Sequence, residues 1–147
     1  EGRGSGEDHG QLRGPRDRIM RLAQRCVLAI WTLAFLVGAF NHGRAIIVGG
    51  WLPYRFAPFA CNLFWTALLP VDIIVAVLLW TKPRLGICLA LLVMVADVAV
   101  NSWTVRHLEL PGLPTALQLQ TLFLGFVLGS APWLLSSSHA SSRGFRR

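Results

Sequence analysis

Residues 67–100 read ALLPVDIIVAVLLWTKPRLGICLALLVMVADVAV. Two apolar runs flank a short basic turn, TKPR at 81–84, and each run carries one aspartate, Asp72 or Asp97. With the residues next to it, each run is long enough to cross the hydrocarbon core of a bilayer, which takes about 20 residues of helix. A turn of four residues forces the two helices to run antiparallel. This stretch therefore predicts a transmembrane helical hairpin with an acidic residue in each arm.

The whole chain has the composition of a membrane protein. Of its 147 residues, 54% are hydrophobic and only 14% are charged, whereas about a quarter of the residues in a typical soluble domain are charged. The charged residues flank long uncharged runs, as they do where membrane spans alternate with loops. Membrane orientation and attraction to anionic headgroups explain the net charge of +7. We therefore expect the lipid bilayer, and no nucleic acid, as the partner of the basic residues.

Outward from the hairpin, the same pattern predicts two further spans and an all-α membrane protein. The four expected spans cover residues 22–40, 56–80, 85–103 and 116–135. Together they form a transmembrane domain over residues 18–135. The connection 41–55 contains Gly and Pro, and its apolar part is expected to rest at the membrane interface. The Gly-rich, charged segment 1–17 and the Ser-rich, basic segment 136–147 are expected to be disordered tails.

The first of these spans has a second interpretation. A basic segment followed by the 15 uncharged residues at 26–40 also matches a cleaved signal peptide. No small-x-small cleavage motif follows, since the chain continues with NHGR at 41–44. We therefore expect a retained span.

The distribution of Lys and Arg predicts the orientation of the bundle. If both termini lie on one side, that side holds eleven of these residues, and the other side holds only Arg44, Arg55 and Arg106. Loops rich in positive charge stay in the cytoplasm. We therefore expect an antiparallel bundle of four transmembrane helices with both termini cytoplasmic, in a plasma membrane or a bacterial inner membrane. The basic segment at 16–25 should meet anionic headgroups.

Small and polar residues mark the helix faces that are expected to meet inside the bundle. Small residues let membrane helices approach closely, and polar residues avoid lipid by facing the interior. Steps of three, four and seven residues return to one helical face. Such stripes are formed by Ala34, Gly38 and His42 in the first span, by Asn62, Thr66 and Leu69 with Asp72 displaced by roughly 80° in the second, by Gly86, Ala90, Asp97 and Asn101 in the third, and by Gln118, Thr121, Gly125 and Gly129 in the fourth.

Counting from the expected span boundaries places a polar cluster in the outer half of the bundle, centred on Asp97. A carboxylate in hydrocarbon costs about 2.5–3.5 kcal/mol on insertion scales, so it needs a partner or a proton. The same counting puts Asp72 about ten residues deeper, or ~15 Å, as a second site. The candidate ligand-binding residues are Asp97, Asn101, Asn62, Thr66, Gln118, Thr121 and Asp72.

No motif points to catalysis, a metal or a cofactor. The sequence contains no GxSxG, HExxH, glycine-rich phosphate loop or redox cysteine pair. Cys26, Cys61 and Cys88 stand singly, and neither His42 nor His107 has a second ligand at metal-binding spacing. We therefore expect no catalytic residue, no metal and no cofactor, and the sequence favours a protein that is not an enzyme.

The four-span pattern with intramembrane acids and Pro70 resembles the emopamil-binding and sigma-2-receptor group. No motif of that group matches residue by residue, so the resemblance implies a four-span fold and assigns no activity or site. Small multidrug exporters share the size and the number of spans. Their essential acid lies in the first span, and the first span expected here, 22–40, contains none.

Three functions compete. In the first, Asp97 and its neighbours line a pocket that binds or transports a small lipophilic or cationic ligand, a lipid or a proton. Transport would require a homo-oligomer or a larger membrane complex, because one four-helix chain is small for a transporter. In the second, a structural or assembly subunit, Asp97 locks helices together with Asn62 and Asn101, and Asp72 satisfies backbone groups freed by Pro70. The third is a membrane enzyme acting on a lipid-like substrate.

Overall fold

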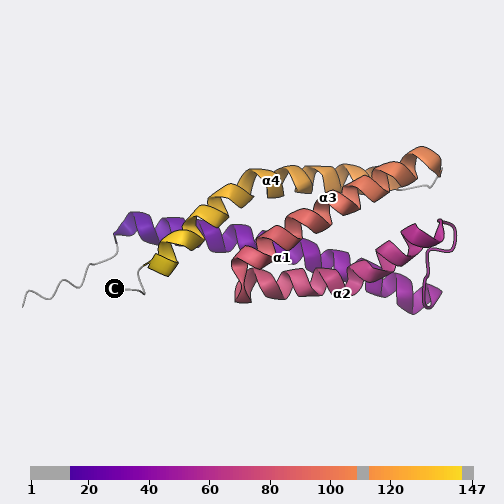
Figure 1. The fold of residues 1–147 in the computed structure, drawn as a ribbon, viewed down its shortest axis with the longest axis horizontal. Coiled ribbons are helices and arrows are strands. Elements are labelled where there is room, and N and C mark those ends of the chain that lie inside the picture. Colours follow the sequence, from indigo (N-terminus) through magenta and orange to yellow (C-terminus); the bar gives the residue numbers. More distant parts are fainter. Residues whose placement is uncertain (1–13, 109–112, 144–147) are drawn as a thin grey trace, which may run out of the picture.

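The computed structural model describes residues 14–108 and 113–143, the last seven of them by their backbone alone. Expectations for residues 1–13, 109–112 and 144–147 lie outside the described residues. Within the described residues, the fold is all-helical, with four helices that are each long and apolar enough to cross a membrane. The helices are α1 Pro15–Gly49, α2 Phe59–Thr81, α3 Pro83–His107 and α4 Leu113–Arg143 (Figure 1).

Helix α1 is longer than the span expected at 22–40. It begins at Pro15, which suits the first turn of a helix because proline lacks the N–H that would be unpaired there. It then continues to Gly49, so the segment expected to lie at the interface is helical. The helix stops at Gly50, whose φ of 76° is readily adopted only by glycine. An apolar segment next to a span extends the helix as readily as it rests on the membrane.

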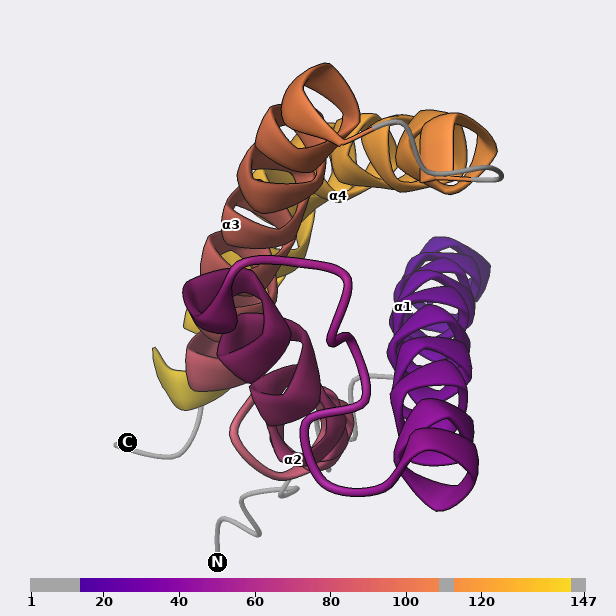
Figure 2. The same cartoon turned by 90° about the vertical axis from the view of Figure 1, so that its right-hand side faces the viewer.

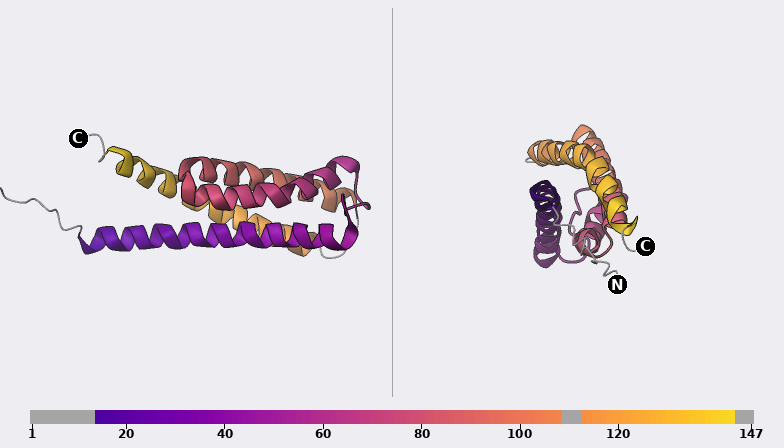
Figure 3. Two further views of the ribbon diagram at one scale, coloured as in Figure 1. Left: turned by 90° about the horizontal axis from the view of Figure 1, so that it is seen from below. Right: turned by 90° about the vertical axis from the view of Figure 1, so that its left-hand side faces the viewer.

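Helix α4 also extends beyond the span expected at 116–135. The expected tail 136–147 begins inside this helix, which continues to Arg143. Serine side chains can bond to carbonyls of the preceding turn, and the Ser136 hydroxyl donates to the Trp133 carbonyl at 2.9 Å. A Ser-rich composition is therefore compatible with helix. Both α1 and α4 extend past the turn between α2 and α3 (Figure 3).

The helices follow one another around an open arc. Helix α2 packs against α1 and α3, and α4 packs against α3, whereas α1 touches α4 only slightly. Figure 2 shows this arc from one end, with α1 and α4 on its open side. The turn between α2 and α3 closes one end of this helix pair, here named the turn end, and the connection 50–58 between α1 and α2 lies at the opposite end, the connection end (Figure 1).

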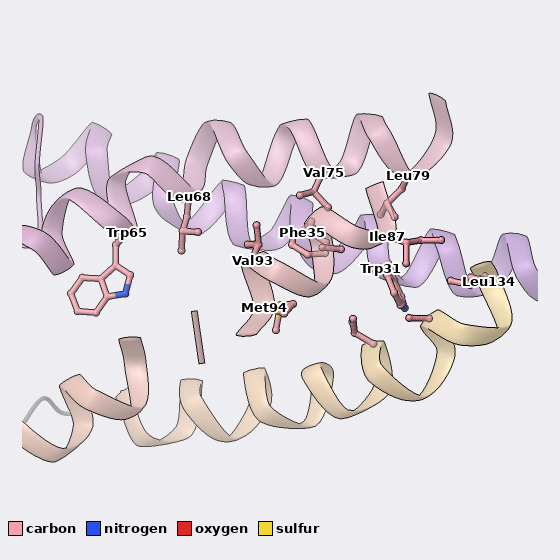
Figure 4. Packing of buried hydrophobic residues seen from close by; sticks show 13 residues of the cluster. Trp31, Phe35, Trp65, Leu68, Val75, Leu79, Ile87, Val93, Met94 and Leu134 are labelled. Atoms are coloured by element: carbon pink, nitrogen blue, oxygen red, sulfur yellow. The ribbon is translucent and has the colours of Figure 1, made fainter. Parts of the chain in front are cut away.

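The hydrophobic core joins all four helices and is densest toward the turn end (Figure 4). Trp31 of α1 is fully buried and packs with Leu79 of α2 and Ile87 of α3. Helix α4 contributes one apolar stripe whose members recur every three or four residues. These members are Val127, Ala131 and Leu134.

Close contact between α2 and α3 depends on Gly86. A Cβ atom at this position would lie 2.5 Å from the Leu79 backbone nitrogen and 2.6 Å from the Leu78 carbonyl carbon. Both are backbone atoms next to a tight turn and cannot move aside without separating the helices. Gly86, Ala90, Asp97 and Asn101 are all buried, as the stripe expected in the third span requires.

We predict that Gly86→Ala destabilises the hairpin by about 1–3 kcal/mol, the usual cost of overpacking. The matched control is Gly125→Ala, because a Cβ there meets nothing within 4 Å. This control should leave stability unchanged or slightly higher. Unfolding in SDS, followed by tryptophan fluorescence, measures both. Equal effects of the two substitutions would show that the Gly86 contact does not limit the packing of α2 on α3.

Candidate functional site: an acidic cavity between the helices

A cavity of about 800 Å³ lies between the four helices, a volume in the range of small-molecule sites. It occupies the half of the bundle nearer the connection end, where its lining comes from 30–42 of α1, 65–72 of α2, 93–101 of α3 and 113–123 of α4. Tyr54 and Phe56 of the connection also line it. Most of the lining is apolar, and the polar side chains are few.

Asp72 and Asp97, the two aspartates of the apolar helices α2 and α3, both face this one cavity. The side chains of Asp72 and Asp97 are only 5% and 8% exposed. The two acids lie ten and fifteen residues from Lys82 in the shared turn, so their depths differ by about 7.5 Å rather than 15 Å. The sequence estimate was too large because it counted from the far ends of the spans, and α3 continues to His107 instead of ending at 103. The two acids therefore belong to one site.

Asn101 connects three helices at the wall of the cavity. Its Nδ2 donates to Oδ1 of Asp97 at 3.1 Å and to Oε1 of Gln120 on α4 at 2.7 Å. Its Oδ1 accepts a hydrogen bond from Nε1 of Trp65 on α2 at 2.8 Å. The bonds that tie α2 and α4 to α3 thus meet at Asn101, and Asp97 takes part only through its own neighbour on α3.

Asp72 faces α1 across a glycine. A Cβ at Gly38 would lie 2.6 Å from Oδ2 of Asp72, so the carboxyl occupies the space that any larger residue would fill. Among the described residues, no group donates a hydrogen bond to this carboxyl, and none forms an ion pair with it or with Asp97. The expectation that Asp72 bonds backbone groups freed by Pro70 finds no such bond in the described part of the chain.

Asn62 and Thr66 do not line the cavity. Asn62 instead fixes the connection 50–58, because its Oδ1 accepts from the Tyr54 backbone N–H at 3.1 Å and its Nδ2 donates to the Leu52 carbonyl at 3.0 Å. Leu52 has a positive φ of 56°, which these bonds hold in place. The Thr66 hydroxyl donates to the Asn62 carbonyl at 2.7 Å. The polar groups of Asn62 and Thr66 therefore form hydrogen bonds that hold the connection, and they do not face the cavity.

Gln118 and Thr121 lie on the exposed face of α4. Gln120 and Phe123 line the cavity in their place. The stripe expected in the fourth span therefore faces away from the interior of the bundle. Gly125, which belongs to this stripe, has nothing within 4 Å of where its Cβ would lie. The apolar stripe that begins at Phe123 was the signal for the true inner face, but lipid accepts apolar residues as readily as the core does, so this signal is weak.

His42 and Tyr54 form a hydrogen-bonded pair at the connection end of the cavity. His42 Nδ1 and the Tyr54 hydroxyl are 2.8 Å apart, and the Tyr54 ring packs edge-on against Trp65 with centroids 5.1 Å apart. Burial, with the charge of Asp97 nearby, raises the pKa of Tyr54 above its ordinary value. The phenol therefore keeps its proton at neutral pH. The sequence gives no sign of this pair, because it depends on the path of the connection.

No group of three His, Cys, Asp or Glu side chains among the described residues could hold a metal ion. The three cysteines are free. In comparisons with known proteins, no family model, no curated protein and no solved structure matches this chain. Function is therefore inferred from the cavity itself.

We predict that Gln120→Ala lowers the free energy of unfolding by about 0.6 kcal/mol, the average for a hydrogen bond between membrane helices. Asn101→Ala should cost more, because it removes the bonds to both Trp65 and Gln120. Gln118→Ala, two residues away on the exposed face, serves as the matched control and should have no effect. SDS unfolding measures all three. A Gln118→Ala effect as large as that of Gln120→Ala would contradict this assignment of the inner face of α4.

Proposed function

We propose that this chain is a small multi-pass membrane protein that binds a lipophilic molecule with a basic head group. The observation that carries the proposal is that two buried carboxyl side chains, Asp72 and Asp97, line the same large apolar cavity. Among the described residues, neither carboxyl forms an ion pair with a cationic side chain. A buried carboxylate is stable only if it is paired or protonated. A protonated amine provides the pairing, and its alkyl body occupies the apolar remainder of the cavity.

The arrangement of hydrogen bonds favours binding over a purely structural role. If the acids served to lock helices together, they would be the junction of the interhelical bonds. That junction is Asn101, which contacts Trp65 and Gln120 directly. Asp97 keeps one oxygen outside its bond to Asn101, and Asp72 accepts no bond in the described part of the chain. Both acids therefore have acceptor capacity to offer a ligand.

The proposal includes an antiparallel bundle with both termini in the cytoplasm, as the positive charge of the flanking segments favours. The cavity then lies in the outer half of the membrane, because it is next to the connection end. The first turns of α1, which carry the exposed Arg16, Arg18, Arg21 and Arg25, extend toward the anionic headgroups of the inner leaflet. The expected location is a plasma membrane or a bacterial inner membrane.

We predict that Asp97→Asn weakens binding of a dansyl-labelled long-chain amine by about 10- to 100-fold, the loss expected when a charge-assisted hydrogen bond becomes a neutral one. The amide keeps the shape of the side chain, so SDS unfolding should be nearly unchanged. Energy transfer from tryptophan to the dansyl group, in lipid nanodiscs, measures binding.

The same assay distinguishes binding from a structural lock. Asp72→Asn should weaken amine binding in the same direction, while Thr121→Ala on the exposed face of α4 should not. If Asp97→Asn binds the amine like the wild type and Asp97→Leu unfolds the protein, the acid is a structural lock and the proposal fails.

We also predict that Gly38→Ala weakens amine binding without removing a charge. The added methyl group collides with Oδ2 of Asp72 and must displace this carboxyl from its position. Because the displaced group is a flexible side chain, we expect only a small change in stability. Gly43→Ala is the matched control on the same helix, since its Cβ meets Leu69 at an ordinary 3.5 Å. Equal binding by the two variants would show that the position of Asp72 does not matter.

A further inference from the structure

We propose that the occupant of the cavity is a single-chain, long-chain amine that enters sideways from the bilayer, through an opening between α1 and α4. This inference rests on the proposed function and adds a ligand class and an access route. The opening, here named the slot, is bordered by Ile30, Leu33 and Val37 of α1 and by Leu119 of α4. Each of these residues lines the cavity.

The slot is visible in the unequal burial of the cavity lining. Every lining residue from α2 and α3 is buried, so these two helices form a closed floor. On the two outer helices, some lining residues are widely exposed: Leu33 is 64% exposed and Leu119 is 65% exposed. A side chain that both lines a cavity and is exposed stands at its mouth. The mouth therefore runs along the line where α1 and α4 scarcely touch, on the open side of the arc in Figure 2.

The chemistry of the slot matches hydrocarbon rather than water. Its four bordering side chains are all aliphatic, and they lie on helices that are long and apolar enough to cross a membrane. The lining of α1 extends from Ile30 to His42, a rise of about 18 Å along the helix. An extended alkyl chain can lie in an opening of this shape, parallel to the lipid chains outside.

The connection 50–58 covers part of the cavity at the connection end, where Tyr54 and Phe56 belong to the lining. Asn62 holds this segment through two hydrogen bonds, and the His42–Tyr54 bond fastens it to α1. The Tyr54 ring contacts both Phe56 and Trp65 edge-on. A route between the connection and α1 would have to break this set of bonds and ring contacts, whereas the route through the slot meets one ring contact, that of Phe35 with Phe123.

Charge complementarity identifies the head group. The floor beneath the slot carries two acids and, within the described residues, no cationic partner for them. His42 also lines the cavity, but its Nδ1 is engaged by Tyr54. A neutral alcohol of the same chain length would fill the same space and leave the acids without a counter-charge. The site should therefore prefer the amine to the alcohol.

The first test maps the occupant on the unmodified full chain in lipid nanodiscs. Two diazirine probes of equal chain length are used, a long-chain amine and the corresponding long-chain alcohol, and labelled peptides are identified by mass spectrometry. We expect the amine to label α1 near Leu33 and α4 near Leu119, and unlabelled amine to suppress this labelling. Labelling by the alcohol should be at least 10-fold weaker. Equal labelling by both probes, or amine labelling confined to the outer faces of α2 and α3, would overturn the inference.

The second test closes the slot. Cysteines replace Val37 and Leu119 in a chain whose Cys26, Cys61 and Cys88 are changed to alanine, and a bifunctional methanethiosulfonate bridges them. The bridged protein should take up the photoreactive amine at least 10-fold more slowly, and a reductant that opens the bridge should restore uptake in the same sample. Uptake at the same rate in the bridged and the reduced protein would show that the slot is not the route.

A further pair of variants tests the slot without cross-linking. Leu33→Trp narrows the mouth and should slow uptake, whereas Ile74→Trp, on an exposed part of α2 that does not line the cavity, should not. The outcomes separate the two proposals. If amine labelling is competitive and depends on Asp97 but ignores the bridge and Leu33→Trp, the route is wrong and the binding function stands. If the wild type shows no competitive amine labelling, the proposed function itself fails.

Discussion

The structure depends on the backbone contact between α2 and α3 at Gly86. This contact leaves no room for a side chain, so it fixes the register of the two helices next to their turn. The register then sets the depths of Asp72 and Asp97 and turns both toward the same space. The outer helices build on this hairpin, with α1 packing on α2 and α4 packing on α3. A cavity with an acidic floor follows from an arc of four helices around a single tight hairpin.

The elements of the hairpin could be predicted from the sequence, because a basic TKPR turn between two long apolar runs has only one simple interpretation in a membrane. The buried stripe of α3 was also predictable, since Asp97 and Asn101 are too polar to face lipid. The end of α1 was not predictable, because an apolar segment such as 45–48 has the same composition whether it extends a helix or rests at the interface.

The lining from α4 and the connection could not be read from the sequence for a different physical reason. In a water-soluble helix, the buried face is apolar and the exposed face is polar, but a helix apolar enough to cross a membrane, such as α4, is apolar on both faces. Gln118 and Gln120 are chemically identical, and only the rotation of α4 about its axis decides which of them reaches Asn101. Tyr54 reaches the cavity from the connection, which Asn62 of α2 holds through two hydrogen bonds.

The distribution of hydrogen bonds also indicates which helices can change their separation most easily. Helix α1 is tied to its neighbours by a bond from Trp80 to Thr32 at one level and by the His42–Tyr54 bond at another, while the indole N–H of Trp31 between α1 and the core has no partner in the described structure. Across the cavity, no hydrogen bond found among the described residues joins 30–42 of α1 to 113–123 of α4. A change in their separation therefore breaks no hydrogen bond, only dispersion contacts and the edge-on contact between the Phe35 and Phe123 rings. We therefore expect α1 and α4 to move apart more easily than α2 separates from α3.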